Sequence, residues 1–134
     1  MQGLALTAVL RDEIIAHCRT QYPKEACGLL AGRGGVVEQV YPMRNVEDSP
    51  VGYSMDPQEQ LQVERRMRQS GQHLVGIFHS HTASAAYPSS VDVRLAISPD
   101  LSYVLVSLKD QAHPEFKSYR IAGTEIMPED VAIR

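Results

Sequence analysis

The chain has 134 residues, a formal net charge of −3 at pH 7 and a sequence pI of about 5.9. Its 43% hydrophobic and 22% charged residues are typical of a globular protein of one domain, so we expect a single domain over residues 1–134. The absence of a long basic block argues against a nucleic-acid partner, and no apolar run approaches the ~20 residues of a membrane span. Two cysteines without a leader-like N-terminus predict reduced thiols in a cytoplasmic protein.

The first third of the chain predicts one helix among three strands. Residues 4–9 form a short apolar opening segment, and apolar side chains at every fourth position predict a helix from about Thr7 to Gln21, stopped before Pro23. Residues 25–32 and 36–43 read as two strands joined by a glycine turn.

The rest of the chain predicts two helices and further strands. After a loop over 45–52 and a short strand at 53–55, Asp56 and Pro57 mark the start of a helix that Gly71 would end. The remaining predicted elements are a strand at 72–80, a helix at 88–98 and strands at 101–108, 113–121 and 124–133. Because strands and helices do not alternate regularly, we predict an α/β or α+β fold, with one mixed β-sheet flanked by about three helices.

Two histidines stand where the strand at 72–80 ends. Residues i and i+2 of a strand face the same side, so His79 and His81 project together and suit one metal ion. A catalytic zinc site takes three protein ligands and leaves one position open, and Asp92, eleven residues on, is the candidate third ligand. The residues alone leave two other interpretations open: exposed histidines at a strand end, and a helix capping box formed by Ser89 and Asp92.

The full set of spacings is more specific than the histidine pair. The pattern His79-x-His81, seven residues, Ser89, two residues, Asp92 resembles the JAMM motif of the MPN-domain metallopeptidases, a family that includes zinc isopeptidases acting on ubiquitin and related modifiers. In the segment YPKEACGLLAG, Glu25 matches the glutamate that this family carries upstream. The resemblance covers most of the chain. It implies a single MPN (JAMM) domain with a cytidine-deaminase-like arrangement of its sheet and helices.

This resemblance also implies roles for the five residues. Zn²⁺ would be the cofactor, held by His79, His81 and Asp92. Glu25 would act as general base and then general acid, and Ser89 would help to stabilise the oxyanion. Cys27 shares a strand face with Glu25 and is expected to be a buried small residue rather than a ligand.

The segment at 79–96 is most similar to the small bacterial, Mec-type members, and Thr82 stands where many other members have proline. That branch implies a peptidase acting on the C-terminal tail of a ubiquitin-like sulfur-carrier protein and releasing cysteine or another amine. Such a tail could add as a strand to an exposed sheet edge. The alternatives are an isopeptidase or precursor-processing hydrolase with another ubiquitin-like target, and a non-catalytic MPN scaffold.

Overall fold

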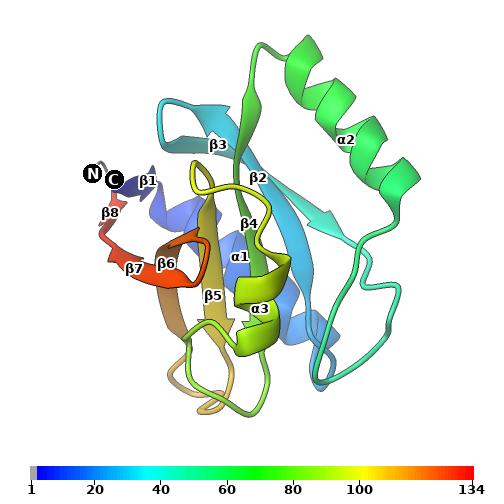
Figure 1. Cartoon of the computed structure of the whole chain (residues 1–134), viewed down its shortest axis with the longest axis vertical. Coiled ribbons are helices and arrows are strands. Elements are labelled where there is room, and N and C mark those ends of the chain that lie inside the picture. Colours follow the sequence, from blue (N-terminus) through cyan, green and yellow to red (C-terminus); the bar gives the residue numbers. More distant parts are fainter. Residues whose placement is uncertain (1–2) are drawn as a thin grey trace.

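The computed structural model describes residues 3–134, which fold into one eight-stranded sheet and three helices (Figure 1). The strands are β1 (Leu4–Leu6), β2 (Cys27–Arg33), β3 (Val36–Met43), β4 (His73–His81), β5 (Ser102–Ser107), β6 (Glu115–Ala122), β7 (Glu125–Glu129) and β8 (Val131–Ile133). The helices are α1 (Ala8–Gln21), α2 (Pro57–Gln69) and α3 (Ser90–Leu95). The predicted mixed sheet with three helices is confirmed.

The strand that ends in the two histidines lies in the interior of the sheet. The strand order is β7-β6-β5-β4-β2-β3-β1-β8, so β4 is bonded on one side to β2 and on the other to β5. The β2 pairing is antiparallel, with Cys27 opposite His79, and the β5 pairing is parallel. This arrangement anchors the end of β4 on both sides and makes it a rigid platform.

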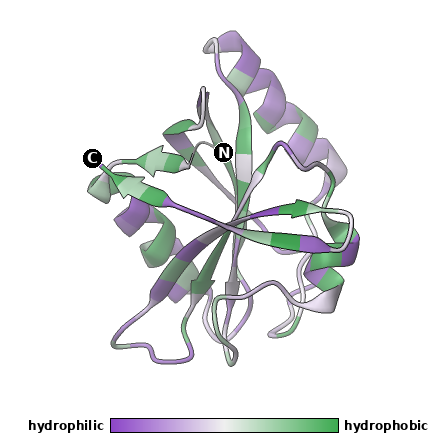
Figure 2. Cartoon of the chain, turned by 60° about the vertical axis from the view of Figure 1, so that its left-hand side comes forward, coloured by the Kyte–Doolittle hydropathy of each residue, from purple (hydrophilic) through white to green (hydrophobic). Residues whose placement is uncertain are grey.

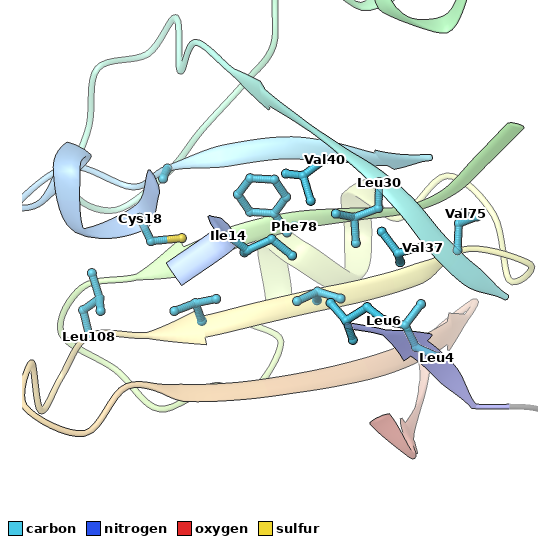
Figure 3. Packing of buried hydrophobic residues seen from close by; sticks show 13 residues of the cluster. Leu4, Leu6, Ile14, Cys18, Leu30, Val37, Val40, Val75, Phe78 and Leu108 are labelled. Carbon is cyan, nitrogen blue, oxygen red and sulfur yellow. The ribbon is translucent and has the colours of Figure 1, made fainter. Parts of the chain in front are cut away.

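The helices cover both faces of the sheet. Helix α1 packs Ile14 and Cys18, which lie four residues apart, against one face, where Phe78 is completely buried (Figure 3). Helix α2 packs Val63 and Met67 on the other face, which α3 also covers. Helix α1 begins as predicted, because the Thr7 hydroxyl accepts a hydrogen bond from the amide of Leu10 and so caps the first turn.

Hydropathy follows this layering. The central strands are largely hydrophobic, whereas α2 shows broad hydrophilic stretches on its ribbon (Figure 2). Within residues 3–134, no helix is both long and apolar enough to cross a membrane.

Three predicted elements need correction. Residues 53–55 are irregular and form no strand. Helix α3 ends at Leu95 instead of near residue 98, because the amides of Ile97 and Ser98 donate to the hydroxyl of Tyr103 and not to helix carbonyls. The segment at 124–133 is two strands, of which β7 pairs with β6 and β8 pairs with β1 at the opposite end of the strand order.

Gly28 offers a test of how tightly β2 is packed beneath the site. A Cβ atom at Gly28 would lie 2.1 Å from Cε2 of Phe78 and 2.7 Å from the carbonyl oxygen of Tyr41. We therefore expect Gly28→Ala to lower the free energy of unfolding by about 1–3 kcal/mol, measured by urea denaturation. Gly52→Ala is the control, since its nearest neighbour, Oε1 of Glu47, would be an ordinary contact at 3.6 Å. Equal denaturation midpoints for the two variants would contradict the packing described here.

Candidate metal centre

His79 and His81 point their ring nitrogens toward each other from the end of β4. Both are buried, with 5% and 6% of their surfaces exposed, and their Nε2 atoms are 3.3 Å apart. The alternation of side chains along the strand places both rings on the face of the sheet that α2 and α3 cover. The alternative interpretation, that these are exposed histidines at a strand end, is therefore excluded.

Asp92 reaches this pair from the first turn of α3. One carboxylate oxygen, Oδ1, lies 3.2 Å from Nε2 of His79, and the other, Oδ2, lies 3.0 Å from Nε2 of His81. The predicted capping box is also present: the Ser89 hydroxyl accepts from the amide of Asp92, and Asp92 Oδ2 accepts from the amide of Ser89. One carboxylate thus both caps α3 and contacts the two histidines, so the capping-box and metal-ligand interpretations of Asp92 are compatible.

The donor set fits a divalent cation. The candidate ligand atoms of His79, His81 and Asp92 all lie within 4.8 Å of one another. Ligands about 2.0–2.1 Å from a tetrahedral zinc ion are ~3.3 Å apart, which is close to the separations found here. Two imidazoles and a carboxylate are also ligands that zinc accepts readily.

The orientation of His81 supports the same conclusion. Its Nδ1 lies 2.9 Å from the carbonyl oxygen of Ala85, and because a carbonyl can only accept, the proton of the neutral ring resides on Nδ1. The lone pair is then on Nε2, which faces His79 and Asp92. A backbone carbonyl that fixes the histidine tautomer is a common feature of metal sites. The ring of His79 is held differently, by stacking on Tyr53 with the ring centroids 4.7 Å apart.

The pKa values in this cluster are shifted in opposite directions. Burial lowers the pKa of His79, and the nearby Asp92 offsets only part of that effect. Burial also acts to lower the pKa of His81, but hydrogen bonds to Asp92 and Ala85 and the charge of Glu25 raise it overall. For Asp92 burial would raise the pKa, and the hydrogen bonds that it accepts from the two histidines when their Nε2 atoms are protonated outweigh burial and lower the value. Asp92 is therefore the fixed negative charge of the cluster.

Glu25 lies beside the cluster because of the antiparallel pairing of β2 and β4. The amide of Ser80 donates to the carbonyl of Ala26, which extends the pairing beyond Cys27 and brings Glu25 next to His81. Strand β2 itself begins at Cys27, so the prediction of Glu25 as a strand residue is wrong by two positions. Burial raises the pKa of the Glu25 carboxyl from 4.5 to about 7, opposed by the charge of His81 and reinforced by those of Asp92 and Glu47.

A groove of about 520 Å³ opens over these residues. Glu25, His81, Ser89 and Asp92 all line it, and His79 adjoins it through its contact with Asp92. One wall is the loop at 47–53 and the other is formed by residues 82–84 and α3. All five residues predicted from the sequence are therefore in one place.

Cys27 does not join the metal ligands. It is completely buried and packs with residues that face α2, as expected, and burial raises the pKa of its thiol to about 12. A thiol with that pKa stays protonated near neutrality and is a poor metal ligand. The other histidines, His17, His73 and His113, lie outside the cluster.

Two residues that contribute to the site have no signal in the sequence. The pattern predicts a short strand at Tyr53, but this residue lies in a loop and stacks on His79. Asn45 falls in a predicted loop, and its side chain bonds to the backbone of Glu25. A buried aromatic or amide in an irregular segment has no periodicity, so only the tertiary contacts reveal it.

A mixed sheet whose interior strand ends in His-x-His, with an aspartate returned by a following helix and a glutamate just before the neighbouring strand, defines a metallopeptidase-type site. The family model described as prokaryotic homologs of the JAB domain matches residues 7–122, and the chain belongs to this JAB (JAMM) family of metallopeptidases.

Three similar proteins illustrate the relationship. The CysO-cysteine peptidase of Mycobacterium tuberculosis is 46% identical over 132 residues, covering 97% of this chain and 90% of that protein. The desampylase of Haloferax volcanii is 35% identical over 111 residues, covering 78% of this chain and 80% of the relative. The solution structure of a protein from Desulfitobacterium hafniense superimposes with a TM-score of 0.89 at 43% identity, covering 98% of this chain and 92% of that one.

The ligand assignment predicts the metal affinity of one variant. Asp92→Asn keeps an acceptor for the amide of Ser89, so helix α3 still starts normally, but it removes the charged ligand. We expect zinc affinity to fall by more than about 100-fold, beyond the 10- to 100-fold loss typical of residues that only support a ligand. Competition with a chromophoric chelator measures this. Ser90→Ala is the control, at an exposed position two residues before Asp92, and it should bind zinc with the affinity of the unaltered protein. Equal affinity of all three proteins would exclude Asp92 as a ligand.

The raised pKa of Glu25 predicts how stability depends on pH in chelator-treated protein. The folded state favours the neutral acid, so Glu25 reduces stability progressively as the pH rises from about 4.5 to about 7. Glu25→Gln removes that loss, and we expect it to raise the free energy of unfolding at pH 8 by up to about 3 kcal/mol and by little at pH 4. Glu13→Gln, at an exposed position on α1, which covers the other face of the sheet, is the control. A pH-independent difference between the unaltered protein and Glu25→Gln would argue against the buried carboxyl.

Proposed function

We propose that this chain is a zinc-dependent peptidase that hydrolyses the amide bond at the C-terminal tail of a ubiquitin-like sulfur-carrier protein, releasing cysteine. The observation that carries the proposal is the convergence of the Nε2 atoms of His79 and His81 with the Asp92 carboxylate beside a buried Glu25. The name of the mycobacterial relative, a CysO-cysteine peptidase at 46% identity, supports the choice of substrate. We further propose that residues 1–134 act as one domain in the cytoplasm.

His79, His81 and Asp92 would hold the zinc ion. Once bound, zinc would polarise the scissile carbonyl and lower the pKa of an attacking water to about 7. The protein contributes the geometry: the Ala85 carbonyl fixes the tautomer of His81, and the capping box fixes the carboxylate of Asp92.

Glu25 is the proposed proton carrier. Burial raises the pKa of this carboxyl to about 7 without a metal ion, and a bound cation would lower it from that value. The carboxylate can then take a proton from the attacking water and later deliver it to the nitrogen of the leaving amine.

Ser89 is the proposed oxyanion donor. Its oxygen accepts the amide hydrogen of Asp92 at 3.1 Å as the cap of α3, and this bond uses a lone pair, not the hydroxyl hydrogen. The hydrogen is therefore free to point into the groove that Ser89 lines. Capping fixes the oxygen in place, so the donor is already positioned when negative charge develops on the carbonyl oxygen.

The groove suits an extended, uncharged tail. Val51, 86% exposed, stands on one wall, and Val91 and Leu95, four residues apart on α3, stand on the other. Addition of the tail to a sheet edge is not favoured, because the edge strands are β7 and β8, whereas the site lies at the end of interior strand β4. We propose instead that the tail lies between the two walls, with its backbone over Ser89 and Glu25.

A second candidate is an isopeptidase that separates a ubiquitin-like modifier from a lysine side chain. The match to an archaeal desampylase favours it. The scaffold alternative receives no support, since the complete set of five residues is brought together around one groove.

A cleavage assay followed by mass spectrometry tests the proposed function. Zinc-loaded protein is incubated with sulfur carriers that have one added C-terminal cysteine, and with carriers linked to a lysine side chain. We expect loss of a single cysteine. Glu25→Gln should lower kcat by about 10²- to 10⁴-fold, the usual contribution of a general acid–base group, and Ser89→Ala by about 10²- to 10³-fold.

Both variants should keep one bound zinc ion, which separates a catalytic defect from loss of metal. Ser90→Ala serves as the control for Ser89, because it is the neighbouring hydroxyl and does not line the groove. Cleavage only of lysine-linked carriers would favour the isopeptidase. If stoichiometric zinc gave no cleavage of either substrate, the proposed substrate class would be wrong.

A further inference from the structure

Asn45, in the loop between β3 and α2, uses the whole hydrogen-bonding capacity of its side chain. Only 8% of the residue is exposed. Its Nδ2 donates to the carbonyl of Glu25 at 3.0 Å and to that of Gly52 at 2.9 Å. Its Oδ1 accepts from the amides of Glu47 at 3.0 Å and Ser54 at 3.2 Å. An amide has two donor hydrogens and two acceptor lone pairs, so all four are satisfied.

These hydrogen bonds fix the backbone of Glu25, which is not part of the regular strand pairing. Strand β2 begins at Cys27, so Glu25 lies just outside the regular ladder. Its amide donates to the carbonyl of Ser49, and its carbonyl accepts from Asn45. Both backbone groups of the proposed base are thus bonded to the loop at 45–54. Asn45 is the buried side chain that joins the two segments, beside the exposed ion pair of Lys24 with Asp48.

The same side chain shapes the wall of the groove. Two of its partners, Gly52 and Ser54, flank Tyr53, whose ring stacks on His79. Val51, on the groove wall, precedes Gly52 directly. A single buried amide therefore couples the base, the ring beside a candidate ligand and one wall of the groove.

We propose that Asn45 is a positioning residue that sets the carboxylate of Glu25 against the scissile bond. The inference rests on the function proposed above. Because Asn45 acts on the reaction through Glu25, its loss should lower kcat more than it raises KM and should leave zinc binding nearly unchanged. A displacement of about 1 Å in a catalytic group can reduce the rate by about 100-fold.

Two variants separate the link to Glu25 from the folding of the loop. Asn45→Ala removes all four bonds. Asn45→Asp keeps oxygens that accept from the amides of Glu47 and Ser54, but at pH 8 it cannot donate to the carbonyls of Glu25 and Gly52. We expect both variants to lower kcat by about 10- to 100-fold, with a smaller rise in KM and one zinc ion bound.

Ser118→Ala is the matched control. Ser118 is buried and donates to Glu129 at 2.7 Å, on strand β6 away from the groove. Its loss also breaks a buried hydrogen bond and lowers Tm, but it should leave kcat unchanged. All proteins are compared well below their Tm, on the substrate that the unaltered protein cleaves.

Three outcomes would overturn the proposal: unchanged kcat in Asn45→Ala, unchanged kcat in Asn45→Asp while Asn45→Ala is impaired, or loss of zinc in both variants. A further measurement needs only the unaltered protein, so it tests the proposal even if the variants fail to fold or the substrates are not cleaved. The side-chain amide hydrogens of Asn45 should exchange with solvent slowly by NMR, as buried bonded groups do. Rapid exchange would refute the link to Glu25 regardless of the substrate.

Discussion

The site depends on the carboxylate of Asp92, which is held by two sets of bonds at once. It accepts the amide of Ser89 and so closes the first turn of α3, and it meets the Nε2 atoms of His79 and His81. Helix α3 is six residues long, and this cap stabilises its first turn. The first turn of α3 therefore positions the candidate ligand, and the carboxylate of that candidate ligand caps the same turn. Tyr103 completes the arrangement by capturing the amides that would otherwise extend α3.

The second constraint is topological. Glu25 and His81 are 56 positions apart in the sequence and adjacent in space, because β2 runs antiparallel to β4 with Cys27 opposite His79. Both strands are interior, and a Cβ atom at Gly28 would meet the ring of Phe78 beneath them. A densely packed platform of this kind keeps groups on two strands at fixed separations. The loop at 45–54 and α3, which the platform carries, supply the parts that surround a substrate.

The sequence predicts the parts of this site that follow from local rules. Alternation along a strand places His79 and His81 together, and the serine–aspartate spacing predicts the cap of α3. The assignment of Asp92 as a candidate ligand rests on the resemblance to the JAMM motif. The helix capped by Thr7 and the strand at 36–43 also follow from periodicity and turn residues. Contacts between irregular segments do not. Asn45 and Tyr53 have no pattern of their own, and the early end of α3 depends on a tyrosine that arrives from β5.

The groove combines a cluster of carboxylates with apolar side chains. Glu25, Glu47 and Asp92 gather carboxylates around a pair of buried histidines, of which His79 has a lowered pKa and so contributes little positive charge. Burial raises the pKa of Glu25 because ionising it there is costly, and the carboxylates of Asp92 and Glu47 add to that cost. A divalent cation at the three ligand atoms would offset this negative potential, and a negatively charged tail segment would add to it. Apolar walls formed by Val51, Val91 and Leu95 instead favour a neutral, extended backbone. The negative potential around the histidines therefore favours a cation, and the apolar side chains suit the uncharged tail proposed above.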